Sequence, residues 1–535
     1  MTWTKRAASR NVWHAVNLNL GTRNLKPLDK LLQTFKNTNE AIECLNRNLA
    51  LHFQGKLDCT CRPKQSQPIV SKAHITEFYV LALLQKLNCR KSSPDCPNIL
   101  YKEAGFLIAQ PLASLFSQSI SERLVPKIWK IGAVTPIPKT SKPTELDVRP
   151  ISVLPTPVKI LEHIIAQQMK QLFMEKLDER QFGFRSGSST LCALIHLDET
   201  VSKYLDDENT LGAVVLSYDL SKAFDKLPHH QILQRLEDLQ FPPNFIEWMW
   251  SYLDQRQQYV KLGIHCSSPV QVTSGVPQGS ILGPLLFVTT VTSYVSKSVG
   301  DVVKYADDTT LCFPISKTDA SRSIMMIQEE HDRFMQWSKL LSLPVNEAKS
   351  KCMTIKKVES CPIPVITGVE SVNTMRILGI TFNSKWNADT HVAKMVSTAS
   401  RRLYALRILK SSLAKKEMIL VFNSISRSLL EYCAPLFLGL SAKNENKMER
   451  IQLRFHRMIC GKSCSQACIQ PLKERRRMLS LKFLNKIIKL GHVLHPLLPP
   501  MSPAGRFLLT PRRTTKRCMS YFPMVCELYN QNFSR

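Results

Sequence analysis

The chain has 535 residues, of which 44% are hydrophobic and 21% charged, a balance that excludes a disordered protein and allows two or more packed units. Its 72 Lys and Arg outnumber its 42 Asp and Glu, which gives a net charge of +30 and a pI near 9.6. This excess suits a polyanionic partner, because each neutralised phosphate releases condensed counterions. A nucleic acid is the leading candidate and an anionic membrane surface the second.

Two features weaken the membrane interpretation. The first twenty residues carry positive charge but no apolar segment of signal-peptide length. The longest weakly polar run, residues 283–295, is too short to span a bilayer and contains hydroxyl groups. The 16 cysteines are scattered, as expected for reduced thiols, so we expect an intracellular protein without a membrane partner.

The first half of the chain begins with polar, mixed residues and becomes helical. Residues 1–74 are interpreted as an N-terminal lead-in or linker. Between residues 74 and 131 apolar side chains recur at three- and four-residue spacing, which predicts helices. Residues 131–155 are basic and interrupted by prolines, which favours short strands and loops, and 159–177 indicates an amphipathic helix.

The middle of the chain mixes strands and helices, and the last third is helical and basic. Residues 212–220 form a nearly continuous apolar strand that ends in an acid. Further elements are predicted as helices at 231–239, 244–253, 280–291 and 319–341, a strand pair at 259–264 and 269–274, a hairpin at 302–313 and a strand at 376–382. From 388 onward the pattern is helical, so we place a boundary near 385.

Three carboxylates stand at predicted strand ends. Asp219 closes the first strand, and Asp307 and Asp308 lie in the hairpin at 302–313. A charged hairpin tip is one interpretation, since Asp is common in turns. The other is a metal site, because hard divalent cations take oxygen ligands from a rigid scaffold and serve phosphoryl transfer in pairs.

Three motifs carry a resemblance to a known family. SYDLSKAFDKLPH (217–229), SGVPQGSILGPLLF (274–287) and YADD (305–308) resemble consecutive motifs of the reverse transcriptases of non-LTR retrotransposons, with jockey-like and chicken-repeat-like elements the most similar. The resemblance covers about residues 75–535. It also includes QFGFRSGSST, WSKLLSLPVNEAKSK and RILGITF.

The resemblance implies a right-hand polymerase of mixed α/β (α+β) class. The fingers would comprise residues 75–210, and the palm, an antiparallel sheet with the catalytic motifs, 211–383. A helical basic thumb or C-terminal region would comprise 384–535. The activity implied is RNA-directed DNA synthesis with an RNA template, a DNA primer or target and dNTPs. A protein of this kind is expected in the cytoplasm and nucleus as a ribonucleoprotein.

The resemblance assigns catalytic roles to residues of this chain by position in the motifs. Asp219 and Asp307 would be metal ligands, and Asp308 would be the second acid of the hairpin. The backbone carbonyl of Leu220 would help to bind the metal, and Gly379 would belong to the primer grip. The cofactor implied is Mg²⁺, two ions per site, with Mn²⁺ as a substitute. One ion would lower the pKa of the primer 3′-hydroxyl, and the other would bind the triphosphate and the leaving pyrophosphate.

Five more positions are assigned to the nucleotide. Phe224 falls where the family keeps an aromatic ring that excludes a ribose 2′-hydroxyl, and Gln278 would lie against the incoming nucleotide. Lys139 and Arg149 would contact the triphosphate, since cationic forks suit phosphate oxygens. Lys349 would give a proton to the pyrophosphate.

Simpler interpretations stand beside several of these roles. Lys139 and Arg149 are equally well explained as solvated loop charges, and Phe224 taken alone as a core aromatic. Asp225 is predicted to be a turn or cap residue rather than a metal ligand. A second group, His456, Cys460, Cys464 and Cys468, recurs every four residues and raises the question of zinc, but structural zinc sites usually pair cysteines across a turn.

The chain also departs from the family. Members carry an endonuclease ahead of the polymerase, and we expect none here, because the chain starts in the segment that joins the two. Residues 287–299 lack the Asn-Asp pair that members usually have. A catalytically inactive, nucleic-acid-binding remnant is therefore the alternative function. An RNA-dependent RNA polymerase is disfavoured by Phe224 and by Ala306 in place of glycine.

Overall fold

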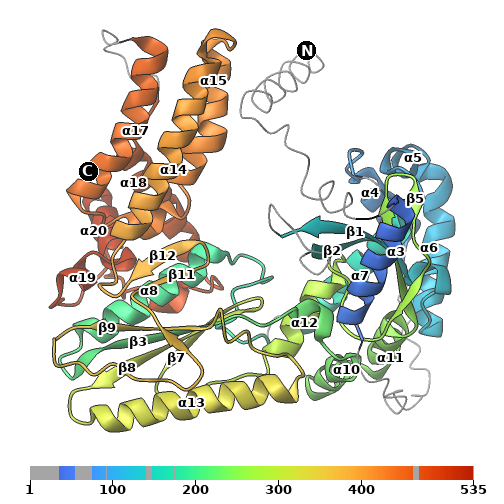
Figure 1. Cartoon of the computed structure of the whole chain (residues 1–535), viewed down its shortest axis with the longest axis horizontal. Helices are drawn as coiled ribbons and strands as arrows, with labels where there is room; N and C mark the ends of the chain where they lie inside the picture. Colours follow the sequence, from blue (N-terminus) through green and yellow to red (C-terminus); the bar gives the residue numbers. More distant parts are fainter. Residues whose placement is uncertain are drawn as a thin grey trace.

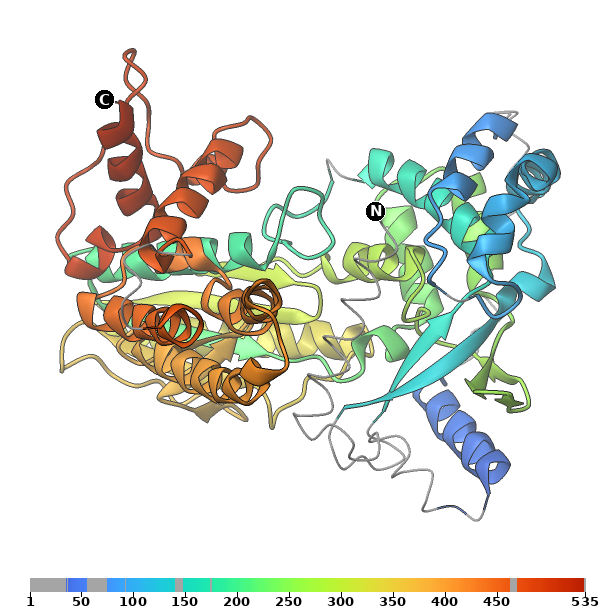
Figure 2. The same ribbon diagram turned by 90° about the horizontal axis from the view of Figure 1, so that it is seen from above.

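The computed structural model describes residues 35, 37–54, 75–91, 93–139, 148–173, 176–461 and 469–533. Two sheets with their helices lie side by side, and a group of C-terminal helices rises from the end of one of them (Figure 1). Figure 2, a view from above, separates the two sheets clearly. None of the described helices is long and apolar enough to cross a membrane.

The central sheet has five strands in the order β10-β9-β3-β8-β7. Their bounds are β3 (Thr210–Tyr218), β7 (Asp301–Tyr305), β8 (Asp308–Ser316), β9 (Lys351–Lys356) and β10 (Glu370–Ser371). β3 pairs antiparallel with both β8 and β9, and β7 and β8 form a hairpin. The sheet is therefore antiparallel apart from the short β9–β10 pair, and the predicted strand at 212–220 and the predicted hairpin are confirmed.

Strand β3 is apolar throughout because both faces of the central sheet are covered. α13 (Ala320–Leu340) lies along one face and α8 (Thr190–Asp206) along the other (Figure 1). Val214 and Leu216 belong to one core cluster, whereas Ala213 and Val215 belong to the other. Successive strand residues point to opposite faces, so a strand buried on both sides loses the usual polar alternation.

The second sheet joins parts of the chain that are distant in sequence. β1 (Ile131–Pro138) pairs antiparallel with β2 (Val148–Val153) and parallel with β4 (Arg256–Leu262). β4 in turn pairs with β5 (His265–Cys266) and β6 (Val270–Val272). The range expected for the palm thus contributes strands to both sheets, and the domain boundaries given above remain predictions.

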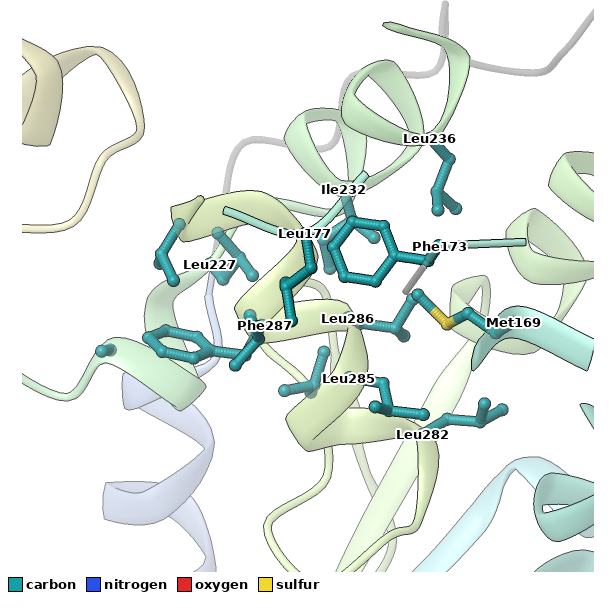
Figure 3. Close-up of a cluster of buried hydrophobic side chains, with 14 of the residues drawn as sticks. Met169, Phe173, Leu177, Leu227, Ile232, Leu236, Leu282, Leu285, Leu286 and Phe287 are labelled. Atoms are coloured by element: carbon teal, nitrogen blue, oxygen red, sulfur yellow. The ribbon is translucent and has the colours of Figure 1, made fainter. Parts of the chain in front are cut away.

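A helical layer connects the two sheets. It contains α7 (Thr156–Phe173), α9 (Ala223–Lys226), α10 (His229–Asp238), α11 (Pro243–Leu253) and α12 (Leu282–Val291). Nearly every residue of α12 is buried, which explains why its sequence has no polar face. Its side chains meet those of α7 and α10 in one cluster, formed by Met169, Phe173, Ile232, Leu236, Leu282, Leu285, Leu286 and Phe287 (Figure 3). This packing holds the loops before α10 and α12 in place.

The prediction that residues 1–74 are a lead-in is wrong for one segment. Residues Thr38–His52 form helix α3, whose N-cap Asn37 accepts a hydrogen bond from the Glu40 N–H at 2.8 Å. The apolar side chains of α3 pack on the second sheet, in a cluster of Ile42, Leu45, Leu49, Val134, Val148 and Val260. Residues 1–34 and 55–74 lie outside the described residues.

Helices dominate the ends of the described chain, as the sequence predicts. Before β1 they are α4 (Glu77–Gln85), α5 (Asn98–Glu103), α6 (Gly105–Glu122) and the 3-10 turn Lys127–Lys130. After residue 388 the α-helices are α14 (Asp389–Ile408), α15 (Lys415–Phe422), α16 (Ser428–Leu430), α17 (Ala442–Cys460), α18 (Leu472–Ile487), α19 (Thr515–Cys518) and α20 (Tyr521–Phe533). The C-terminal segment returns to α8, where the Phe522 N–H donates to Glu199 at 2.9 Å.

Residues 376–382 do not form a single strand as predicted. β11 (Thr374–Ile377) and β12 (Ile380–Asn383) make a separate hairpin instead. Its two turn residues, Leu378 and Gly379, have φ angles of 45° and 88°. Positive φ at both central positions is the geometry of a two-residue hairpin turn, so the Leu-Gly pair reverses the chain where the apolar pattern suggested continuity.

The docking of α3 can be tested with two leucines on the same helix. Leu45 is fully buried, whereas Leu51 is 59% exposed. We expect Leu45→Ala to lower the free energy of unfolding by about 2–5 kcal/mol, because it leaves a cavity against the second sheet. Leu51→Ala should change it by less than about 0.5 kcal/mol. Thermal unfolding of both variants decides the matter, and equal effects would contradict the packing described for α3.

Candidate active site

The register of the central sheet brings the three predicted acids to one end of it. Tyr218 pairs with Thr309, so the next residue, Asp219, lies beside Asp308 at the start of β8. Ala306 and Asp307 form the two-residue turn of the β7–β8 hairpin, and Ala306 has φ 58°. The acids therefore share one sheet edge although the segments that carry them are far apart in sequence.

Like charges dominate the electrostatics of this edge. Burial raises the pKa of Asp307, and the charge of Asp219 raises it further, while Lys349 and Arg149 act in the opposite direction. The pKa of Asp308 is raised to about 6 by its low-dielectric surroundings and then by Asp307 and Asp219. Because the side chain of Asp308 is exposed, the negative charges of Asp307 and Asp219 are the main physical cause of its raised pKa.

A lysine partly neutralises the cluster. Lys349 Nζ lies 2.9 Å from Asp219 Oδ2. Its position follows from the preceding segment, since the Asn346 N–H donates to the Asp219 carbonyl at 2.8 Å and Asn346 begins the turn that carries Lys349. Leu220 lies opposite Val345, but the backbone hydrogen bonds at this point are made by the residues on either side of them. The Leu220 carbonyl takes no part in these hydrogen bonds.

The donor chemistry of this edge fits a hard divalent cation. As the side chains stand, however, no group of three or more Asp, Glu, His or Cys side chains within the described ranges is gathered closely enough to hold a metal ion. Two effects keep the carboxylates apart: they repel one another, and Lys349 holds Asp219 in an ion pair. Binding of a cation would need the acids to converge and Asp219 to leave Lys349.

Gln181 supports the hairpin turn and was not predicted as a site residue. Its Oε1 accepts hydrogen bonds from the Gly183 N–H at 2.8 Å and from the Ala306 N–H at 3.2 Å. The Phe182 N–H donates to the carbonyl of Lys304 at 2.8 Å, so this segment lies along β7. The resemblance of QFGFRSGSST to a family block was the available signal, but it gave Gln181 no role.

Phe224 lies at the border between the core and the site. Its ring stacks on Phe287 with 4.3 Å between centroids, and it meets Phe184 edge-on at 6.4 Å. Phe184, which sequence reasoning missed, has φ 56° and is 48% exposed. Phe287 thus fixes one face of the Phe224 ring, as a residue that shapes a binding site requires.

Gln278 is placed by an acid. Its Nε2 donates to Asp225 Oδ1 at 2.5 Å, and burial raises the pKa of Asp225 to about 6. Asp225 lies in the short helix α9 with its side chain buried, so it orients Gln278 instead of closing an exposed turn. The backbone at Gly275, which has φ 75°, passes close to the backbone of Asp225. Only glycine fits there, because a Cβ would lie 2.4 Å from the Asp225 carbonyl oxygen.

The remaining predicted residues lie on two hairpins. Lys139 follows β1, and Arg149 lies on β2. The charge of Arg149 acts to lower the pKa of Asp307, and that of Lys139 acts to lower the pKa of Asp225, so each cation lies near one of these acids. Gly379 is in the turn of the separate β11–β12 hairpin, where the Tyr432 hydroxyl donates to the Leu378 carbonyl at 2.9 Å.

Two of the four residues considered for a zinc site are within the described residues. His456 and Cys460 lie in the last turns of α17. Cys464 and Cys468 lie outside the described residues.

Comparison with known proteins agrees with this geometry. Residues 137–382 match the family described as "Reverse transcriptase (RNA-dependent DNA polymerase)". This range contains β2, the strands β3, β7 and β8 with the three acids at their ends, and all but the last residue of the β11–β12 hairpin.

Relatives from mobile elements match over a longer range. The chain is 28% identical over 463 residues to the Drosophila melanogaster protein named "Probable RNA-directed DNA polymerase from transposon BS", covering 79% of this chain and 50% of that protein. It is 29% identical over 371 residues to the RNA-directed DNA polymerase from mobile element jockey of the same organism, covering 66% and 40%. The chain thus spans about half the length, or less, of these curated relatives.

Among solved structures, the apo telomerase of Candida tropicalis is similar with a TM-score of 0.37 and 12% sequence identity, covering 73% of each chain.

The family match and the relatives agree with each other. The chain carries a reverse transcriptase domain over residues 137–382 and is similar to the RNA-directed DNA polymerases of non-LTR retrotransposons such as BS and jockey. Its fold is of mixed α/β class, with an antiparallel sheet that bears the motif acids at one end.

The contact between the Gln181–Gly183 segment and the β7–β8 turn can be tested by substituting Gly183. A Cβ at Gly183 would lie 2.4 Å from the Ala306 nitrogen, whereas one at Gly132 would meet nothing closer than 3.5 Å. We expect Gly183→Ala to lower the free energy of unfolding by about 1–3 kcal/mol through overpacking. Gly132→Ala is the matched control and should cost clearly less. Indistinguishable unfolding midpoints for the two variants would show that the segment does not support the turn.

The repulsion between the acids predicts a stability gain on removing one of them. Without divalent cations, Asp308→Asn should raise the unfolding midpoint by about 1–2 °C, because one of the clustered like charges is lost. Saturating Mg²⁺ should abolish or reverse the difference, since the parent then gains the free energy of cation binding. Differential scanning fluorimetry with and without Mg²⁺ measures both. A variant that is less stable than the parent without Mg²⁺ would contradict the repulsion.

Proposed function

We propose that the chain is an RNA-directed DNA polymerase that adds deoxynucleotides to a primer 3′-hydroxyl on an RNA template. The observation that carries the proposal is the shared sheet edge of Asp219, Asp307 and Asp308 within a reverse transcriptase domain. The names of the relatives support the same chemistry, which they state for longer proteins.

The three acids and the Leu220 carbonyl are the residues that would hold divalent cations. Mg²⁺ as two ions, with Mn²⁺ as a substitute, suits their oxygen ligands. When bound, the ions would supply activation of the 3′-hydroxyl and charge neutralisation at the triphosphate. Lys349 would then be released from Asp219. Its ammonium would be available to give a proton to the leaving pyrophosphate.

The nucleotide would lie between the hairpin acids and the second sheet. Arg149 on β2, near Asp307, and Lys139 just after β1, near Asp225, would bind the triphosphate oxygens. Phe224, held by Phe287, would occupy the space of a ribose 2′-hydroxyl. Gln278, oriented by Asp225, would lie against the nucleotide.

The template and primer would lie along the basic C-terminal third. The β11–β12 hairpin packs against α14, and its turn with Gly379 would grip the primer. The net charge of +30 supplies the counterion-release term for binding an RNA–DNA duplex. We assign the second sheet with its helices to the fingers, the central sheet to the palm and the C-terminal helices to the thumb.

Primer extension tests the proposal directly. With an RNA template, a DNA primer, dNTPs and Mg²⁺, the parent should extend the primer. Asp307→Ala should reduce the rate by at least about 100-fold, since a metal ligand contributes several kcal/mol to the transition state. Duplex binding, measured alongside, should be the same in both proteins. Binding without extension by the parent would favour the inactive remnant and reject the enzyme.

The role of Phe224 is tested by sugar selection. We expect Phe224→Val to raise incorporation of NTPs relative to dNTPs by at least about tenfold, because the smaller side chain admits the 2′-hydroxyl. Phe184→Val is the matched control, since it shortens the aromatic residue that meets Phe224 edge-on and leaves Phe224 itself in place. The ratio of kcat/KM for the two sugars is the measurement. An unchanged ratio, or a parent that uses NTPs equally well, would contradict this role.

A further inference from the structure

Helix α3 ends beside the loop that follows Asp219. The Nζ of Lys222 lies within hydrogen-bond distance of His52 Nε2, and His52 is the last residue of α3. The next carbonyl, that of Phe53, accepts hydrogen bonds from the Thr273 N–H at 3.0 Å and the Ser274 N–H at 2.8 Å. The end of a helix outside the family match is thus tied to the segments on both sides of the nucleotide site.

Lys222 has an unusual backbone conformation. Its φ of 51° lies in the left-handed region, and its carbonyl accepts from the N–H groups of Asp225 and Lys226 at the start of α9. This conformation is unfavourable for a lysine, so the surrounding contacts must hold it there. The turn places Lys222 between Asp219, a motif acid, and Phe224, the ring proposed to select the sugar.

The surroundings of Lys222 are positively charged. Burial lowers the pKa of His52 to about 4, and the charges of Lys222, Lys139 and Lys226 act in the same direction. The pKa of Lys222 is lowered by burial and then by Lys139 and Lys226. His52 is therefore a neutral imidazole, which can accept a hydrogen bond from an ammonium group without adding to the positive charge.

We propose that His52 is a positioning residue that holds the Lys222 ammonium for the triphosphate of the incoming nucleotide. Three lysines gathered around one neutral acceptor form a site suited to a multiply charged anion, and a triphosphate is the anion that the proposed function requires. The inference rests on that function. The inference adds two residues to the proposed site, His52 of α3 and Lys222, for which the sequence predicted no role.

A purely structural explanation is that His52 only docks α3. The helix has independent anchors, however: its buried apolar side chains and Asn46, whose Nδ2 donates to the Ser268 carbonyl at 2.8 Å. Asn46 is fully buried and lies on α3 well before His52. A variant at Asn46 therefore weakens docking without touching Lys222, which separates the two explanations.

Steady-state primer extension provides the test. His52→Ala should raise KM for dNTPs about five- to tenfold with kcat within about twofold, because a hydrogen bond to a charged group is lost before chemistry. His52→Gln should restore most of the KM, since its amide oxygen can accept from Lys222. Combining His52→Ala with Lys222→Ala should raise KM no further than Lys222→Ala alone. Asn46→Ala should leave KM unchanged.

The proposal is overturned by any of three results. These are an unchanged KM in His52→Ala, an equal rise in Asn46→Ala, or additive effects of the His52 and Lys222 substitutions. A parent that extends no primer would reject the proposed function instead. In that case equilibrium binding of a fluorescent mant-dATP decides the role of His52. Binding weakened in His52→Ala but not in Asn46→Ala supports the role, and any other pattern overturns it.

Discussion

The antiparallel register of β3 against β8 is the constraint on which the site depends. It pairs Tyr218 with Thr309 and so sets Asp219 next to Asp308, with Asp307 in the adjoining turn. Helices α8 and α13 bury both faces of this sheet, and a shift by one residue would turn every side chain of β3 to the wrong core. The packing thus enforces a cluster of like charges that no local preference would assemble.

Several neighbouring features respond to that cluster. Lys349 and Arg149 reduce the repulsion from outside the sheet, and Gln181 Oε1 accepts one hydrogen bond from the turn, from the Ala306 N–H. Arg149 comes from the second sheet, which the chain builds from β1, β2 and the much later β4. Arg149 and the acids therefore belong to separate sheets, joined by the layer of α7, α10 and α12.

The sequence predicted what short motifs encode. Asp219 and the Asp307–Asp308 pair follow apolar strand patterns directly, so their places at strand ends could be expected from local residues. Phe224, Gln278, Lys139 and Arg149 were expected near the nucleotide from the resemblance. In the structure Gln278 binds Asp225, and Arg149 is near enough to Asp307 to act on its pKa. Their chemical roles stay predictions that the experiments above address.

What the sequence could not supply depends on contacts between distant segments. His52 meets Lys222 across 170 positions, and Gln181 meets Ala306 across 125. Neither glutamine nor histidine carries a local signal for such a partner. Helix α3 was missed because the mixed composition of residues 1–74 hid one amphipathic segment. The β11–β12 hairpin was missed because a Leu-Gly turn interrupts the strand without a polar residue.

The central claim is that the three acids form one divalent-cation site. Electron paramagnetic resonance of Mn²⁺ titrated into the protein measures this without any reaction. The parent should bind Mn²⁺, and Asp219→Asn and Asp307→Asn should each weaken binding by at least about tenfold, because each removes a charged ligand. Asp332→Asn, which removes an exposed carboxylate of helix α13, should leave it unchanged. Equal Mn²⁺ affinity in the parent and in both site variants would contradict the account.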